Sequence, residues 1–261
     1  MIKVSDIAQA LEAFAPMELQ ESYDNAGLQV GNPDMPVTAA LLCLDVTEEM
    51  IDEAIARKCN MIISHHPLLF KGLKHITGDT YIERIVIRAI RENIAIYSAH
   101  TNLDSTFEGV SYEIAHSLSL RNVEVLCPNK ENPKTGLGII GDIEPTPKLE
   151  FLRKIRDEFN VRSLRFSAQS PQIVIRKVAL CGGAGADFIE EAVHRGADCY
   201  ITGDLKYHDF TTWGTDILLA DLGHFESELI SRKIFARVLN KKFPDFVTWI
   251  TESEKSPVSY I

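Results

Sequence analysis

Residues 61–67 read Met61-Ile-Ile-Ser-His-His-Pro67, a short apolar run closed by two histidines and a proline. The run predicts a buried strand, and Pro67 ends it because proline has no backbone N–H to extend a sheet. His65 and His66 are therefore expected at the carboxyl end of a strand, where open α/β sheets bind ligands. Neighbouring side chains of a strand point in opposite directions, so both reach one site only if the backbone turns there. Alone, the pair also fits one buried and one surface histidine without chemistry.

Two further apolar runs end in the same kind of residue. His100 and Asp104 follow a second run, and His224 and Glu228 follow a third. His224 and Glu228 are four residues apart in a stretch, 225–239, with helical periodicity, so their side chains share one helix face. Such a pair is also common on exposed helix surfaces. Imidazoles and carboxylates at three predicted strand ends, taken together, indicate a metal site.

Composition and charge exclude several classes of protein. The 261 residues are 45% apolar and 25% charged, as in ordinary globular proteins, and the net charge is −10. This acidic balance disfavours nucleic acid as a partner. No apolar stretch approaches a membrane span, and the N-terminus lacks the features of a signal peptide. Five cysteines without a CxxC spacing predict reduced, buried thiols and a cytoplasmic protein, with a catalytic cysteine as the minor alternative.

Strands and helices alternate along most of the chain, which predicts an α/β fold. We expect two similar α/β domains or halves, with mostly parallel sheets flanked by helices and the metal site in the cleft between them. The first domain is expected to contain residues 1–127 with the C-terminal segment 240–261, and the second residues 128–239. A loop is expected around Ser170 and Pro171.

A weak internal repeat supports two halves. It pairs Cys43 with Cys181 and continues at a constant offset through a strand, a helix and a second strand. Two generic βαβ units would share such patterning by necessity, so chance similarity is the alternative. In the second copy Asp204 takes the place of the second histidine of the pair. His208 and Asp209 follow it and are second-tier site candidates, although a polar surface loop explains them as well.

The predicted site has more ligands than one catalytic zinc ion needs, since such an ion usually keeps about three protein ligands and an open position. The surplus suggests two ions, with Asp104 or Glu228 bridging them. A pair of ions can activate a shared water or hydroxide for attack on a phosphoryl group or a carbon. Mixed imidazole and carboxylate ligands suit Zn, Fe, Mn or Ni, and the sequence does not choose among them.

A glycine-rich loop, Gly182–Gly185, follows another predicted strand. Its backbone N–H groups could contact a phosphate. The loop lacks the full GxGxxG pattern and a P-loop lysine, so a tight turn that requires positive φ explains it better.

Six ordered segments resemble the NGG-interacting-factor-three-like family, whose members are often labelled GTP cyclohydrolase I type 2 homologues. The resemblance extends from near residue 20 to the C-terminus, with Tyr23 standing where the family often has Trp. The segments that carry it are 23–31, 64–70, 98–104, 182–185, 200–204 and 221–228.

This resemblance implies a two-domain α/β fold, a ring-shaped homohexamer and a dinuclear metal site. It also implies a set of ligands at the matching positions, with His100 beside the metals in a catalytic or orienting role. The implied ligands are His65, His66, Asp104, His224 and Glu228.

Three functions follow from these observations. The first is a metal-dependent hydrolase that uses a metal-bridging hydroxide and two divalent ions on a small molecule, possibly a nucleotide as in GTP cyclohydrolase or a phosphoester. The second is a non-enzymatic metal-binding or scaffold protein. The third is a purely structural metal site, with saturated coordination and collapse on chelation. Ligands beside proline and glycine turns favour an open site, and hence the hydrolase.

Overall fold

The computed structural model describes residues 1–168 and 173–261, which form two compact units. The first unit is Met1–Thr106 with Ser231–Lys255, and the second is Phe107–Ile230 with Ser256–Ile261. The sequence suggested boundaries near residues 127 and 240. The structure differs because residues 107–128 form a helix and a strand of the second sheet, and residues 231–242 form a helix against the first N-terminal helix. The loop expected around Ser170 and Pro171 lies outside the described residues.

The first unit contains a five-stranded sheet, in the order β1-β4-β3-β2-β11. The strands β4, β3, β2 and β11 are parallel to their neighbours, and β1 is antiparallel to β4. The strands are β1 (Gly27–Val30), β2 (Ala39–Cys43), β3 (Met61–Ser64), β4 (Ala95–Ser98) and β11 (Val247–Ile250).

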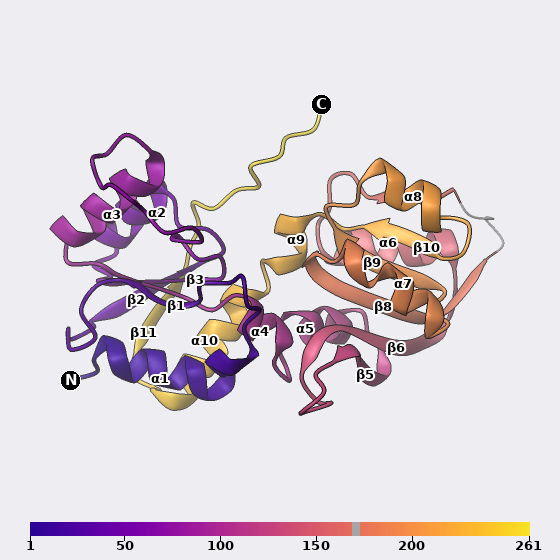
Figure 1. Cartoon of the computed structure of the whole chain (residues 1–261), viewed down its shortest axis with the longest axis horizontal. Helices are drawn as coiled ribbons and strands as arrows, with labels where there is room; N and C mark the ends of the chain where they lie inside the picture. Colours follow the sequence, from indigo (N-terminus) through magenta and orange to yellow (C-terminus); the bar gives the residue numbers. More distant parts are fainter. Residues whose placement is uncertain (169–172) are drawn as a thin grey trace. The chain divides into compact units, whose positions relative to one another are not determined.

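Helices cover both faces of this sheet, with α2 and α3 on one face and α1 and α10 on the other (Figure 1). The strands β2, β3 and β4 are buried along their whole length, as their continuous apolar runs predict. The hydroxyl oxygens of Thr47 and Thr80 cap α2 and α3 by accepting from backbone N–H groups. The helices are α1 (Val4–Phe14), α2 (Glu48–Ala56), α3 (Tyr81–Arg91), α4 (Thr101–Ser105) and α10 (Ser231–Lys242), with a 3₁₀ turn η1 (Met17–Leu19).

The second unit contains a six-stranded sheet, in the order β5-β6-β8-β9-β10-β7. It is parallel at its centre, where β9 pairs with β8 and β10, and antiparallel toward both edges. Its strands are β5 (Arg121–Pro128), β6 (Gly136–Pro147), β7 (Arg165–Phe166), β8 (Val174–Ala184), β9 (Cys199–Gly203) and β10 (Leu218–Asp221).

Helices flank the second sheet as well. In Figure 1, α7 lies in front of this sheet and α6 behind it. The helix predicted over 225–239 is divided into α9 and α10 by a turn at Leu229 and Ile230. The helices of this unit are α5 (Val110–Ser117), α6 (Lys148–Glu158), α7 (Ile189–His194), α8 (Tyr207–Trp213) and α9 (His224–Glu228), with a 3₁₀ turn η2 (Ala186–Phe188).

The two units share a local order of elements. The separation between Cys43 and Cys181 places β3 onto β9, and α2 onto η2 and α7. The predicted α/β fold, with two sheets flanked by helices, is confirmed, although the second sheet has more antiparallel pairings than the sequence suggested. Among the described residues, every helix is too short or too polar to cross a bilayer.

Candidate metal centre

Three histidine rings of the first unit lie together at the carboxyl end of its sheet. His65 and His66 follow β3, and His100 follows β4, the neighbouring parallel strand. The ring centroids are 5.2 Å apart for His65 and His66, 5.2 Å for His65 and His100, and 5.4 Å for His66 and His100. One nitrogen of each ring lies within 4.8 Å of the others, close enough for the three to hold a metal ion. The backbone therefore turns at the pair so that both rings reach one place.

Each of these rings contacts an oxygen atom through Nδ1. His65 Nδ1 is 2.9 Å from the carbonyl oxygen of Ala99, which can only accept, so Nδ1 donates. His66 Nδ1 is 2.8 Å from Asp45 Oδ1, and His100 Nδ1 is 2.8 Å from Asp24 Oδ1. An imidazole that donates from Nδ1 keeps the lone pair of Nε2 for a metal, which is the usual arrangement of metal-binding histidines.

Asp104 adds a carboxylate to this group. It lies in α4, which begins directly after His100, and its backbone N–H donates to the His100 carbonyl over 3.1 Å. Asp104 Oδ1 is 3.5 Å from His65 Nε2, and the His65 ring is fully buried. The first unit thus places three imidazoles and one carboxylate at one edge of its sheet.

Asp24 is buried beneath His100. Its carboxylate accepts hydrogen bonds from the hydroxyl and the backbone N–H of Thr101 as well as from His100. Burial alone would raise the pKa of Asp24, but the hydrogen bonds from His100 and Thr101 outweigh it and hold this pKa well below its usual range. Asp24 therefore stays ionised and fixes the orientation of the His100 ring.

The second unit carries a smaller group with the same design. His224 and Glu228 lie on α9, directly after β10, and His224 Nε2 is 3.0 Å from Glu228 Oε2. The shared helix face predicted from their spacing is confirmed. His224 Nδ1 is 2.8 Å from Asp204 Oδ2, so an aspartate again contacts Nδ1. In the repeat, Asp204 takes the place of the second histidine of the pair. Its carboxylate contacts the ring of a histidine and so holds that ring in position.

The glycine-rich loop packs directly against Glu228. Gly183 has φ +64°, and a Cβ at this position would overlap Glu228 Oε1. Its backbone N–H donates to Ser227 Oγ over 2.9 Å. At Gly203, a Cβ would lie 2.7 Å from the backbone nitrogen of His224. Gly183 and Gly203 are therefore explained by close approach to α9, which favours the tight turn over a phosphate-binding loop.

The second-tier candidates have local structural roles. Asp209 accepts from the backbone N–H of Lys206 over 2.6 Å at the start of α8, and His208 is exposed on that helix. The cysteines are free thiols, as predicted. Burial raises the pKa of Cys43 and Cys199 well above the usual value, which argues against either as a nucleophile.

The sequence did not point to Asp24, Asp45 or Asp204 as partners of the histidines. A signal was present for two of them. Asp45 follows β2, which is parallel to β3, and Asp204 follows β9, which is parallel to β10. Carboxyl ends of parallel strands meet at one sheet edge, so an aspartate there lies near the next strand's histidine.

Both α/β units carry imidazole and carboxylate side chains at the carboxyl ends of their sheets, and these side chains could hold a metal ion. A family model described as "Duf34/NIF3 (NGG1p interacting factor 3)" matches residues 2–257. The chain belongs to this family.

Relatives and solved structures agree with this assignment. A "GTP cyclohydrolase 1 type 2 homolog" of Clostridium acetobutylicum is 39% identical over 241 residues, 91% of this chain and 90% of the relative. Another of that name, from Clostridium perfringens, is 35% identical over the whole length of both chains. The crystal structure of Staphylococcus aureus protein SA1388 is similar at TM-score 0.92 and 27% identity, covering 100% of this chain and 99% of that one. A Bacillus cereus protein related to NIF3 has TM-score 0.90 at 25% identity, covering 100% and 99%.

Proposed function

We propose that this protein is a metal-dependent hydrolase with two divalent ions per chain. The proposed ligands are His65, His66, Asp104, His224 and Glu228. The observation that carries the proposal is the hydrogen bonding of the histidines. Each of His65, His66 and His224 contacts an oxygen through Nδ1, the arrangement in which Nε2 is the nitrogen that binds a metal.

The donor set fits such ions. It combines neutral imidazoles with carboxylates, which suits Zn, Fe or Mn. Aspartates contact Nδ1 of His66, His100 and His224 and hold these rings in place. A bound pair of ions would supply Lewis acidity and lower the pKa of water at the site.

The remaining chemistry belongs to residues of the chain. His100 is proposed to transfer a proton at Nε2 between the attacking water and the leaving group. Its ring is fixed by the ionised Asp24, which favours the protonated imidazole when it forms. The Phe70 ring lies edge-on to the His100 ring, with the two centroids 6.2 Å apart.

The proposed substrate is a nucleotide or another small phosphorylated molecule. The names of the relatives, "GTP cyclohydrolase 1 type 2 homolog", support a nucleotide, and imidazole-bound divalent ions bind phosphate oxygens. A homohexamer remains our expectation from the family resemblance, and a cytoplasmic location remains our expectation from the spacing of the cysteines.

The first experiment measures metal content by elemental mass spectrometry on tag-free protein purified without chelators. We expect about two ions per chain, and a large loss in the folded double variant His65→Ala/Glu228→Ala. The matched control is His116→Ala/Glu158→Ala, which changes an exposed histidine and an exposed glutamate. Metal content far below one ion per chain, unchanged after incubation with Zn, Mn or Fe, would overturn the proposal.

Turnover is tested separately on the metal-loaded protein. GTP and a panel of phosphoesters are incubated with it, and formate and phosphate release are measured. His100→Ala is expected to retain the metal and lose at least about a hundredfold in turnover. Metal binding without turnover on any substrate would instead support the metal-binding or scaffold function.

A further inference from the structure

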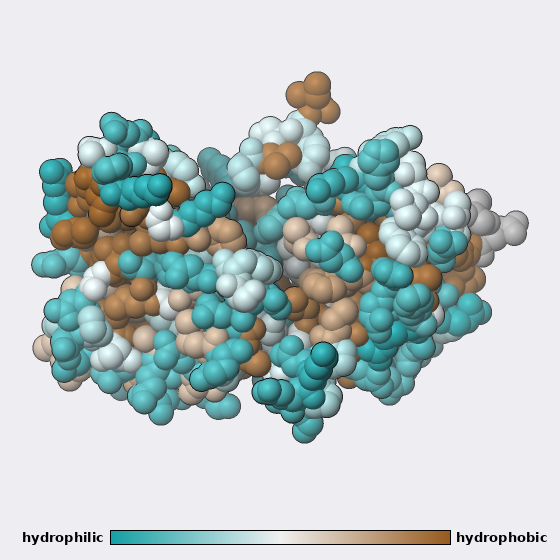
Figure 2. All heavy atoms as spheres, viewed as in Figure 1, coloured by the Kyte–Doolittle hydropathy of each residue, from teal (hydrophilic) through white to brown (hydrophobic). Residues whose placement is uncertain are grey.

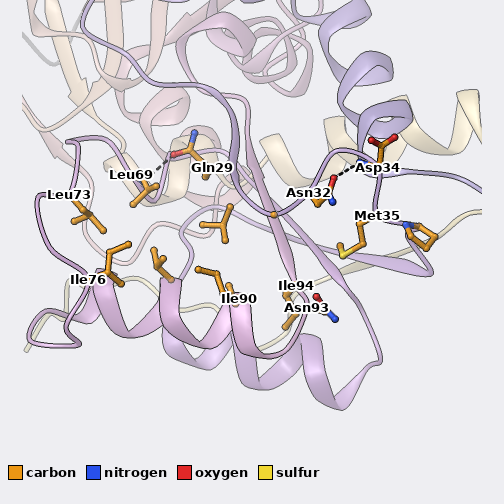
Figure 3. Close-up of a pocket in the computed structure, with 15 residues that line it drawn as sticks. Gln29, Asn32, Asp34, Met35, Leu69, Leu73, Ile76, Ile90, Asn93 and Ile94 are labelled. Carbon is orange, nitrogen blue, oxygen red and sulfur yellow. Dashed lines mark hydrogen bonds between the residues drawn. The ribbon is translucent and has the colours of Figure 1, made fainter.

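A long groove of about 870 Å³ runs beside α3 in the first unit. Figure 3 shows Leu73 and Ile76 at one end, Met35 and Asp34 at the other, and Ile90 along the helix between them. This volume lies within the range of small-molecule sites. None of the proposed metal ligands lines the groove.

The floor of the groove is an apolar face of α3 together with the segment that follows the helix. Val86 and Ile90 line it at helical spacing, about 6 Å apart along the helix axis, and Ile94 lines it from the segment between α3 and β4. Ile90 is 61% exposed and Ile76 is 52% exposed, which is unusual for large apolar side chains lining one cavity. In Figure 2, hydrophobic residues gather over the place of α3 in Figure 1.

Hydrogen bonds hold the walls in position without a ligand. Gln29 Oε1 accepts from the backbone N–H of Leu69 over 3.1 Å, which joins β1 to the loop that follows the histidine pair. Glu83 Oε2 accepts from the backbone N–H groups of Thr77 and Gly78, each over 2.9 Å, directly after Ile76. A groove with fixed walls binds an apolar chain at a lower entropic cost than a flexible one.

The loop that forms one end of the groove carries two lysines, which are not among the residues that line it. Lys71 and Lys74 flank Leu73 in the loop and are exposed, and within residues 1–168 and 173–261 neither ammonium group lies in a salt bridge. At the other end, Asp34 is paired with Lys3 over 2.9 Å. The net charge of the chain is −10, so an anion would be attracted here only by this local pair of lysines.

We propose that the groove binds a small anionic amphiphile, with its hydrocarbon chain along α3 and its carboxylate or phosphate group near Lys71 and Lys74. The apolar floor accounts for the chain, and the unpaired ammonium groups account for the anionic head. This site is independent of the proposed metal centre.

The test measures binding by isothermal titration calorimetry on the full chain at low ionic strength, below the micelle concentration of each probe. The probes are dodecanoate, dodecyl phosphate, dodecanol and dodecyltrimethylammonium. We expect both anions to bind, dodecanol to bind about tenfold more weakly, and the cation to bind more weakly still. The difference between carboxylate and phosphate probes identifies the preferred head group.

Variants assign the binding to the groove. Ile90→Glu should weaken dodecanoate binding by about tenfold or more, because it places a charge in the apolar floor. Its control is Ile55→Glu, which changes another exposed isoleucine on α2. Lys71→Glu/Lys74→Glu should weaken the anions and leave dodecanol unchanged.

A second control, Lys130→Glu/Lys134→Glu, makes the same change in net charge on exposed residues of the other unit. The proposal is overturned if no anion binds, if the cation binds as well as the anions, or if Ile55→Glu and Ile90→Glu have equal effects. It is also overturned if Ile90→Glu changes the oligomeric state, measured by sedimentation, while probe binding is unaffected; the groove would then be a contact between copies of the chain.

Discussion

Replacing Gly183 with alanine should damage the metal site through one added methyl group. The residue has φ +64°, and its Cβ would overlap Glu228 Oε1 and lie 3.0 Å from Glu228 Cδ. The left-handed backbone alone should cost about 1 kcal/mol with a side chain present. Overpacking against the buried Glu228 should add about 1–3 kcal/mol, because the carboxylate must move out of its position.

Gly196 provides a matched control. It has φ +72°, and a Cβ there meets nothing within 4 Å, so Gly196→Ala carries the backbone cost without the overlap. We expect urea unfolding to show a loss of about 1 kcal/mol for Gly196→Ala and about 2–4 kcal/mol for Gly183→Ala. Metal affinity should fall by about tenfold or more in Gly183→Ala, because Glu228 is displaced, and stay unchanged in the control.

Two results would refute this reasoning. If both variants lose the same stability, the predicted overlap with Glu228 does not occur. If Gly183→Ala is selectively destabilised but binds metal as the parent does, the carboxylate of Glu228 is not a ligand, and the assignment of α9 to the metal site fails.

Two further predictions concern carboxylates that accept hydrogen bonds. Burial would raise the pKa of Glu53, but hydrogen bonds from Thr251 and the segment after it lower this pKa from 4.5 to about 2. Glu53 should therefore stabilise the fold by up to about 3 kcal/mol above pH 4.5, and this stabilisation should be lost as the pH falls through 2. Urea unfolding of Glu53→Gln should show this loss of unfolding free energy at pH 7 and a smaller loss at pH 3. The control is Glu252→Gln, which changes an exposed carboxylate. A loss that is independent of pH would contradict the prediction. Asp45→Asn and Asp204→Asn should each weaken metal binding by about 10–100-fold, measured in competition with a chelator. The unfolding midpoint of the metal-free protein should stay nearly unchanged. Unaltered metal affinity would show that these carboxylates do not position the histidines.

Much of the local structure was predictable because it depends on short-range patterns. The continuous apolar runs predicted β2, β3 and β4, and the helical spacing of His224 and Glu228 predicted their shared face. Other features depend on pairing between distant segments. The strand β7 consists of Arg165 and Phe166, which pair with the edge of β10. The turn at Leu229 ends α9, but no glycine or proline occurs there from which the end of the helix could be predicted.

The sequence by itself determined which imidazoles and carboxylates lie at the carboxyl edges of the two sheets. Imidazoles and carboxylates after apolar runs end at the carboxyl edge of a sheet wherever such runs form parallel strands. Only the tertiary structure decided which aspartate oxygen contacts the Nδ1 atom of each histidine. Asp45 contacts His66 from the end of the neighbouring parallel strand, and Asp204 contacts His224 in the same way. Asp24 contacts His100 from a turn 76 residues earlier in the chain. These contacts join segments far apart in the chain, so they are fixed by strand order and packing, which no local pattern of residues encodes.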